Sequence, residues 1–206
     1  MLFRQKQFSL DGVNRGHHNT TYRGIPCIKC PFDYVMYQMI INELKPDLII
    51  EIGTNNGGSA LYMADILDTI GKGIIHTIDI ESKVGELVQQ HDRINLFTDG
   101  WEGYGLEEVN NVGKVLVIED GSHMYDSTLG AMKKFNQIVS VGSYMIIEDG
   151  ILDALGTSKK HYYGGPVRAI KKFLSENDNF IIDKKWEDMY GPSATFNTSG
   201  YLKRIK

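Results

Sequence analysis

The sequence has only two cysteines and five prolines among its 206 residues, and it contains no long apolar run. A membrane-spanning helix needs about 20 consecutive apolar residues, so we expect no membrane partner. The N-terminus also lacks an apolar segment followed by a small-residue cleavage site, the pattern of a secretory signal. We therefore expect a cytoplasmic protein.

An excess of positive charge is absent as well. The chain carries 22 lysine and arginine residues against 26 aspartate and glutamate residues, which gives a net charge of -4 at pH 7. Nucleic-acid-binding proteins usually concentrate basic residues on one face, whereas the basic residues here are scattered along the sequence. We expect one compact domain with no nucleic-acid partner, and the sequence leaves a homo-oligomer open.

Cys27 and Cys30 form a C-x-x-C pair in the segment GIPCIKCP. A structural zinc site uses four ligands, and a thioredoxin-type pair follows a strand and opens a helix. Because Pro26 and Pro31 bracket the pair in a turn-like segment, two reduced thiols in a loop are the favoured interpretation. Metal binding or redox function is the alternative.

The stretch from Asp47 to Ala60, DLIIEIGTNNGGSA, combines an apolar strand, a glycine-containing turn and the start of a helix. Its aliphatic run predicts a parallel strand buried on both faces. Gly53 lets a ligand approach the backbone, and the amide groups of Gly58 and Ser59 would be free donors at the helix N-terminus. The pattern predicts that a small anionic or polar ligand binds near Gly53.

Strand and helix patterns alternate along most of the chain. Residues 1–30 show no clear periodicity and predict an N-terminal arm or lid, followed by one domain at 31–206. The fold class is α/β, a Rossmann-like doubly wound sheet that is mostly parallel with an antiparallel C-terminal hairpin. Its predicted strands are residues 48–53, 74–80, 94–97, 114–120, 142–149, 179–183 and 196–204, with helices at 31–44, 58–70, 84–90, 124–139 and 167–174.

Carboxylates follow the ends of the predicted strands, where ligands bind in open α/β sheets. Asp79 ends the second strand, and an acidic residue at that position in adenosine sites accepts both ribose hydroxyls. The alternative is that Asp79 caps a helix near Glu81. Asp120, Glu148 and Asp149 follow strands four and five, so a divalent cation, Mg²⁺, Mn²⁺ or Ca²⁺, would relieve their repulsion. Helix caps and salt bridges are the alternative for these three.

Two further side chains complete the candidate site. Trp101 follows the third strand, where its ring could stack on adenine or belong to the core. His123 lies three residues beyond Asp120 and could accept a proton from a metal-bound hydroxyl near neutral pH. An ordinary polar contact is the alternative for His123.

The assembled pattern resembles the class I S-adenosylmethionine-dependent methyltransferases. The run Glu51-x-Gly53-x-x-x-Gly57-x-Ser59 is similar to the cofactor turn of catechol O-methyltransferase-like enzymes, which hold Mg²⁺ with an aspartate after strand four and an acidic-amide pair after strand five. Those enzymes carry a catalytic lysine where this chain has His123, a departure from their pattern.

A closer resemblance, along nearly the whole chain, is to the cephalosporin hydroxylase-like and rhamnosyl O-methyltransferase group. The similar segments are KCPFDYVMYQ, LKPDLIIEIGTNNGGSAL, VIEDGSH, GSYMIIEDG, GGPVRAIKKFL and GYLKR. The fold and motifs of this group imply methyl transfer, often to sugars. Either Glu119 or Asp120 could then be the metal ligand after strand four.

The resemblance implies a role for each candidate residue. Asp120 and His123 would be catalytic, with His123 receiving the proton of a substrate hydroxyl whose pKa Mg²⁺ lowers. The acceptor would be a sugar or another small hydroxylated metabolite. A nicotinamide-dependent oxidoreductase and a non-catalytic cofactor-binding accessory protein are the alternatives. S-adenosylmethionine would bind to Glu51, Gly53, Thr54, Asn55, Ser59, Asp79, Gly100, Trp101 and Asp120, and Mg²⁺ to Asp120, Glu148 and Asp149.

Overall fold

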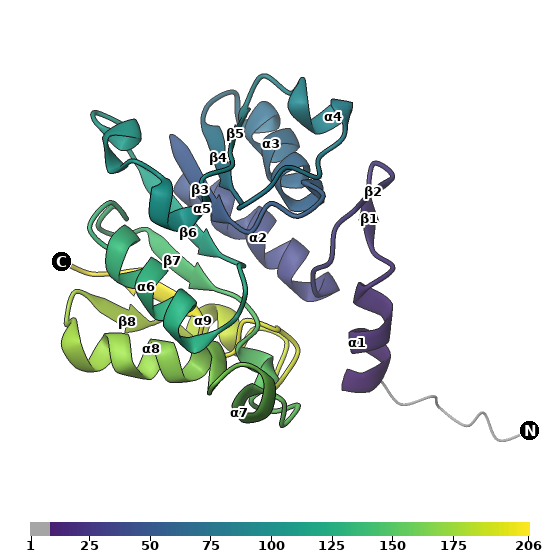
Figure 1. Cartoon of the computed structure of the whole chain (residues 1–206), viewed down its shortest axis with the longest axis vertical. Helices are drawn as coiled ribbons and strands as arrows, with labels where there is room; N and C mark the ends of the chain where they lie inside the picture. The colour runs from purple at the N-terminus through teal and green to yellow at the C-terminus, as the bar shows by residue number, and fades with distance from the viewer. Residues whose placement is uncertain (1–8) are drawn as a thin grey trace, which may run out of the picture.

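The computed structural model describes residues 9–206 and shows a sheet covered by helices on both faces (Figure 1). Seven strands form the sheet in the order β5-β4-β3-β6-β7-β9-β8. The neighbours from β5 to β7 are parallel, whereas β9 runs antiparallel to β7 and to β8. This confirms the predicted α/β sheet with its antiparallel hairpin. The strands are β3 (Leu48–Ile52), β4 (Ile74–Ile78), β5 (Ile94–Phe97), β6 (Val115–Glu119), β7 (Tyr144–Ile147), β8 (Phe180–Ile182) and β9 (Tyr201–Arg204).

Helices pack on both faces because alternate residues of each buried strand point to opposite sides. Ile49 and Leu116 pack in the core that includes residues of the helices Pro31–Leu44 and Gly58–Ile70. Ile50 and Val117 pack in the core on the other face, with residues of the helices Tyr125–Phe135 and Gly165–Glu176. The apolar runs of the sequence are therefore strands buried on both faces. The helices are α2 (Pro31–Leu44), α3 (Gly58–Ile70), α4 (Glu86–Gln89), α5 (Gly100–Gly103), α6 (Tyr125–Phe135), α7 (Ser158–His161), α8 (Gly165–Glu176) and α9 (Lys184–Glu187), with 3₁₀ turns η1 (Leu106–Val109) and η2 (Gly150–Leu152).

The described part of residues 1–30 has more regular structure than its sequence predicts. It forms α1 (Leu10–His17) and a small antiparallel sheet of β1 (Thr21–Tyr22) and β2 (Ile25–Pro26). Ser9 caps the helix, since its Oγ accepts a hydrogen bond from Gly12 N at 3.1 Å. An eight-residue helix held by a cap and by tertiary contacts is too short to show a clear periodicity. The first eight residues of the predicted arm lie outside the described residues.

The last strand is shorter than predicted, because residues 196–200 form a loop. Asp33 at the start of α2 fixes this loop by accepting hydrogen bonds from Thr195 Oγ1, from Phe196 N at 3.0 Å and from Tyr201 OH at 3.1 Å. Gly200 passes so close to β7 that a Cβ there would lie 1.9 Å from Ile147 O. Phe196, the large apolar residue of this loop, is buried without belonging to a strand.

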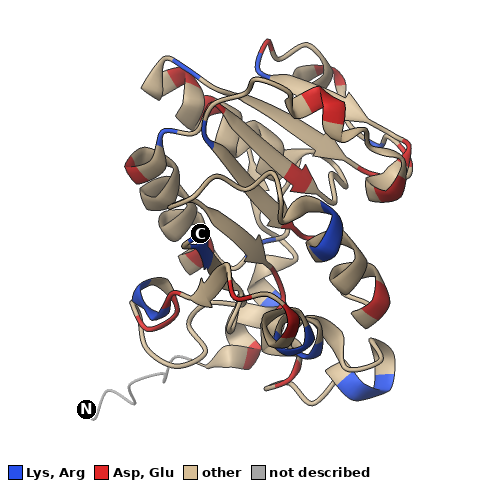
Figure 2. Ribbon diagram, turned by 90° about the vertical axis from the view of Figure 1, so that its left-hand side faces the viewer, with Lys and Arg blue, Asp and Glu red and all other residues tan. Residues whose placement is uncertain are grey.

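The carboxyl ends of the central parallel strands lie level with one another. Ile52 pairs with Ile78 on one side and with Glu119 on the other, and Glu119 pairs with Ile147. The direction in which the chain adds strands reverses between β3 and β6, and ligands bind in such sheets beside this reversal. No described helix is both long and apolar enough to cross a membrane. Lysine and arginine are interspersed with aspartate and glutamate over the ribbon (Figure 2).

Candidate active site

A pocket of about 770 Å³ lies at the carboxyl ends of the parallel strands. Residues of the strand ends line one side, and residues of α1 and α7, with neighbouring loops, line the other. The four residues predicted as catalytic or metal-binding all line it: Asp120, His123, Glu148 and Asp149. Of the predicted cofactor residues, Gly53, Asn55, Asp79, Gly100, Trp101 and Asp120 line it.

The turn after β3 touches the end of β6 through the backbone. Gly53 N donates to Ile78 O at 2.8 Å, and Asp120 N donates to Ile52 O at 2.8 Å. Gly53 has a φ of +103°, and a Cβ there would lie 2.0 Å from Asp120 O. Only glycine fits this position, so the predicted cofactor turn and the predicted metal ligand are joined in one rigid unit.

Three of the predicted cofactor residues lie beneath this turn and do not line the pocket. Glu51 is fully buried and accepts hydrogen bonds from Ser59 Oγ and from Thr77 Oγ1, the latter at 2.7 Å. Burial raises the pKa of Glu51 to about 7, although Lys29 and the two hydroxyls act against the increase. Thr54 Oγ1 pairs with Thr77 Oγ1 at 2.7 Å. The structure thus gives Glu51, Thr54 and Ser59 contacts that shape the turn from below.

The segment between β2 and α2 packs against the N-terminus of α3, and neither Gly58 nor Ser59 lines the pocket. A Cβ on Gly58 would lie 2.3 Å from Pro26 O and 2.6 Å from Cys27 Cβ. The segment between β2 and α2 therefore crosses directly over the start of α3. Gly58 is needed for this crossing, and the polar groups that reach the pocket come from the turn instead.

Asp79 organises the side of the pocket next to β4. Its Oδ2 accepts a hydrogen bond from Asn55 N at 2.9 Å, and its Oδ1 accepts one from Ile80 N at 2.8 Å. The alternative that Asp79 caps a helix is wrong, because α4 starts at Glu86 with Gly85 at its N-cap position. Gly100 N donates to Asp79 O at 3.0 Å, which joins the loop after β5 to the same unit.

Trp101 follows on α5 and lines the pocket while resting against α6. Its Nε1 donates to Ser127 Oγ at 3.2 Å, and a Cβ on Gly130 would lie 2.6 Å from the indole ring. Trp101 belongs partly to the core and partly to the pocket, so both sequence-based interpretations describe part of its environment.

Asp120, His123 and Asp149 form a cluster whose potential ligand atoms all lie within 4.8 Å of one another. His123 Nε2 lies 3.2 Å from Asp149 Oδ2. Burial raises the pKa of Asp120 and of Asp149. Burial lowers the pKa of His123, but Asp149, Asp120 and Glu119 outweigh this, so the pKa is raised overall.

His123 and Asp149 both have left-handed backbone conformations, with φ of +57° and +58°. Asn55, which also lines the pocket, has a φ of +47°. Such conformations cost about 1–2 kcal/mol for residues other than glycine and occur often at functional sites. Three of the nine described non-glycine residues with positive φ thus follow strand ends at this edge of the sheet.

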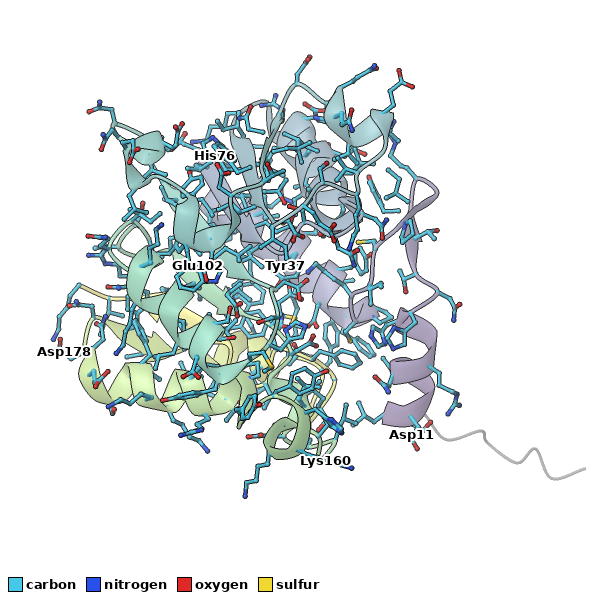
Figure 3. The ribbon with its side chains drawn as sticks, viewed as in Figure 1. Asp11, Tyr37, His76, Glu102, Lys160 and Asp178 are labelled. Carbon is cyan, nitrogen blue, oxygen red and sulfur yellow. The ribbon has the colours of Figure 1, made fainter. Side chains whose placement is uncertain are left out.

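Glu148, the third predicted metal ligand, has different partners. Its Oε1 accepts a hydrogen bond from Tyr37 OH at 2.7 Å and a second one from Lys29 Nζ. Lys29 Nζ also donates to Asp120 Oδ2 at 2.8 Å. Tyr37 lies near the centre of the molecule (Figure 3). The predicted set of three carboxylates is therefore linked through a lysine.

Lys29 is the site residue that the sequence-based prediction does not include. Its side chain is only 2% exposed, and the acidic groups around it hold the pKa of its ammonium well above the usual range although burial acts in the opposite direction. It stands between Cys27 and Cys30, within the segment KCPFDYVMYQ that carries part of the family resemblance. That position was the available signal.

Of Glu119 and Asp120, only Asp120 lines the pocket. Glu119 is buried, and its Oε1 accepts a hydrogen bond from Gly121 N at 3.3 Å. Burial raises the pKa of Glu119 to about 7. Its Oε2 has no hydrogen-bond partner among the described residues. Asp120 is accordingly the carboxylate that can reach a ligand.

The donor chemistry fits a divalent cation. Asp120, Glu148 and Asp149 bring three carboxylates together, and Lys29 supplies one full positive charge. Carboxylate oxygens are the ligands that Mg²⁺ prefers, and an ammonium already lies between two of them. The site thus carries more negative charge than its own basic residues balance.

Cys27 and Cys30 are free thiols in the interior. Cys30 Sγ donates to Ala194 O at 3.1 Å. Burial raises the pKa of Cys27 to about 11 and that of Cys30 to about 12. Both cysteines therefore act as packing residues that fix the segment carrying Lys29.

Comparisons with known proteins agree with this architecture. The sequence model of the family Rhamnosyl O-methyltransferase/CmcI matches residues 14–205. A rhamnosyl O-methyltransferase of Mycobacterium bovis (strain BCG / Pasteur 1173P2) is 33% identical over 195 residues, which cover 90% of this chain and 78% of that protein. A rhamnosyl O-methyltransferase of Mycobacterium leprae (strain TN) is 30% identical, covering 91% of this chain and 84% of that protein.

Solved structures share the fold. A CmcI structure with SAH is similar with a TM-score of 0.71 and 20% identity, covering 100% of this chain and 96% of that chain. A CmcI structure with Mg and SAM has a TM-score of 0.68 and 21% identity, covering 100% and 88%. The predicted class I methyltransferase fold and O-methyltransferase class are confirmed. The chain belongs to the Rhamnosyl O-methyltransferase/CmcI family.

Proposed function

We propose that this O-methyltransferase uses S-adenosylmethionine and Mg²⁺ to methylate a hydroxyl of a sugar or another small hydroxylated metabolite. The observation that carries the proposal is the backbone contact between Gly53 and Asp120, which puts the predicted cofactor turn and the acidic cluster on one pocket. One pocket can then receive a methyl donor and an acceptor side by side, as group transfer requires.

The cofactor half of the pocket is formed by the turn after β3, by Asp79 and by the loop that carries Trp101. Asp79 has carboxylate lone pairs in addition to those that accept from Asn55 N and Ile80 N, so it can accept ribose hydroxyls. Trp101 offers part of its ring to the pocket. Bound S-adenosylmethionine supplies a methyl group on a reactive sulfonium.

The acceptor half is formed by the acidic cluster together with residues of α1 and α7. Asp120, Glu148 and Asp149 would hold Mg²⁺, which when bound lowers the pKa of an acceptor hydroxyl. His123 is the proposed proton acceptor. Its Nε2 lies beside Asp149, one of the proposed metal ligands, whereas its Nδ1 is buried. The named activity of the mycobacterial relatives supports a sugar acceptor.

The test is a methylation assay with purified protein, S-adenosylmethionine, Mg²⁺ and rhamnosides as acceptors, read by mass spectrometry. We expect a product heavier by one methylene unit, lost on addition of a chelator and restored by Mg²⁺. Asp120→Ala should remove the activity. Full activity of Asp120→Ala would exclude the metal assignment. Binding of cofactor without product for any hydroxylated acceptor would favour the accessory-protein alternative.

A further inference from the structure

Lys29 contacts two of the three carboxylates that are the proposed metal ligands. The ammonium of Lys29 is 2.8 Å from Asp120 Oδ2 and also contacts Glu148 Oε1. Magnesium binds carboxylate oxygen at about 2.0–2.1 Å and needs near-octahedral geometry. A metal ion that bridges Asp120 Oδ2 and Glu148 Oε1 would need the place that the ammonium takes, so its binding there requires the departure of Lys29.

The main chain around Lys29 is fixed on both sides. Cys27 packs against Gly58 at the start of α3, Lys29 N donates to Cys27 O at 3.0 Å, and Cys30 Sγ donates to Ala194 O. The side chain, in contrast, lines the 770 Å³ pocket. The Lys29 side chain can therefore rotate into the pocket without movement of the main chain.

Tyr37 keeps Glu148 in place when the lysine leaves. Its hydroxyl donates to Glu148 Oε1 at 2.7 Å, and its ring centroid lies 5.5 Å from Lys29 Nζ. Tyr37 itself is fully enclosed in the core. The main chain of Asp120 is held by its hydrogen bond to Ile52 O. Glu148 thus keeps one partner, and Asp120 keeps its backbone position, whichever cation lies between them.

We propose that Lys29 is a built-in competitor of the metal, a cation that holds Asp120 and Glu148 together and has to leave them when a divalent ion binds. This inference rests on the proposed Mg²⁺ site. It makes the affinity for metal lower than the three carboxylates alone would give. It also couples metal binding to the delivery of an ammonium group into the pocket.

Metal titration of Lys29→Met by calorimetry, with Mg²⁺ and with Mn²⁺, tests the competition without any turnover. We expect at least about tenfold tighter binding than in the natural protein, because charge-assisted hydrogen bonds to Lys29 no longer have to be broken. Lys83→Met is the matched control, since Lys83 lines the same pocket but pairs with the exposed Glu81. It should bind metal as the natural protein does.

Equal or weaker binding by Lys29→Met would overturn the inference and leave the Mg²⁺ site standing. No binding by either protein at millimolar metal would overturn the site and the inference together.

Should Lys29→Met fail to fold, reductive methylation of the natural protein decides, with the peptide containing Lys29 followed by mass spectrometry. Lys29 should be protected without metal and react several-fold faster with Mg²⁺, whereas Lys83 should not change. Unchanged protection of Lys29 would contradict the competition.

Discussion

Gly53 lies so close to Asp120 that a single methyl group on Gly53 would fall 2.0 Å from the Asp120 carbonyl oxygen. The two residues directly follow adjacent parallel strands, and both line one pocket. A change at Gly53 therefore reaches the proposed metal ligand directly.

Gly53→Ala should destabilise the protein by about 2–5 kcal/mol, since it combines an unfavourable φ with a backbone clash that neither strand can avoid. Urea unfolding measures this. Gly71→Ala is the matched control: Gly71 also has a positive φ, +82°, but a Cβ there meets nothing within 4 Å. It should cost only about 1–2 kcal/mol. Similar losses in both variants would show that the contact with Asp120 is unimportant.

Asp79→Asn should weaken binding of S-adenosylmethionine by about 10–100-fold, the effect of losing charge-assisted hydrogen bonds to a ribose. Calorimetry on the folded variant measures it. Asp99→Asn provides the comparison, because Asp99 lies in the neighbouring loop but does not line the pocket. Unchanged affinity in Asp79→Asn would restrict the role of Asp79 to holding Asn55 and Ile80.

The central sheet could be predicted because each buried strand has a distinctive local sequence. Runs such as the one around Ile49 and Ile50 are apolar at nearly every position, which only strands buried on both faces require. Asp79 and Asp120 could be placed at one edge for the same reason, since parallel strands end together. The sequence could not show how deeply each side chain lies below that edge. Glu51 precedes Ile52, the last residue of its strand, and its side chain is buried inside the protein.

Lys29 could not be predicted because its partners are 91 and 119 positions away in the sequence. No strand or helix period connects a loop lysine to the ends of β6 and β7. Its placement depends on the crossing of Pro26 and Cys27 over Gly58, a tertiary contact. The helix α1 escaped prediction similarly, since a cap and packing stabilise it more than its own composition does.

Asp33 gives the protein a stability that depends on pH. Burial raises the pKa of Asp33 to about 7, with repulsion from Glu148 adding to the effect and its hydrogen bonds opposing it. The folded state then binds more protons than the unfolded state between about pH 4 and pH 7, so the contribution of Asp33 to stability falls as pH rises through that window.

Asp33→Asn removes this titration and keeps an oxygen that can accept from Phe196 N. The stability of the variant relative to the natural protein should therefore increase between about pH 5 and pH 8, as measured by urea unfolding. Asp47→Asn is the control, because the hydrogen bond from Lys72 lowers the pKa of Asp47 and leaves it ionised throughout this range. Its relative stability should stay constant. A constant difference for Asp33→Asn as well would show that Asp33 does not titrate in this range.

Trp101 should report cofactor binding by its fluorescence. The chain has two tryptophans, and only Trp101 lines the pocket, whereas Trp186 is 1% exposed and packs with the core between the sheet, α2 and α3. Stacking of an adenine on the Trp101 ring would quench its emission, because the aromatic base then lies in direct contact with the excited indole. Titration with S-adenosylmethionine should lower the emission of the natural protein and of Trp186→Phe alike. Trp101→Phe should lose the change, and Trp101→Ala should also bind more weakly, by about 5–100-fold if the ring stacks on the base. Quenching that survives in Trp101→Phe but disappears in Trp186→Phe would place the cofactor elsewhere and contradict the proposed adenine side of the pocket.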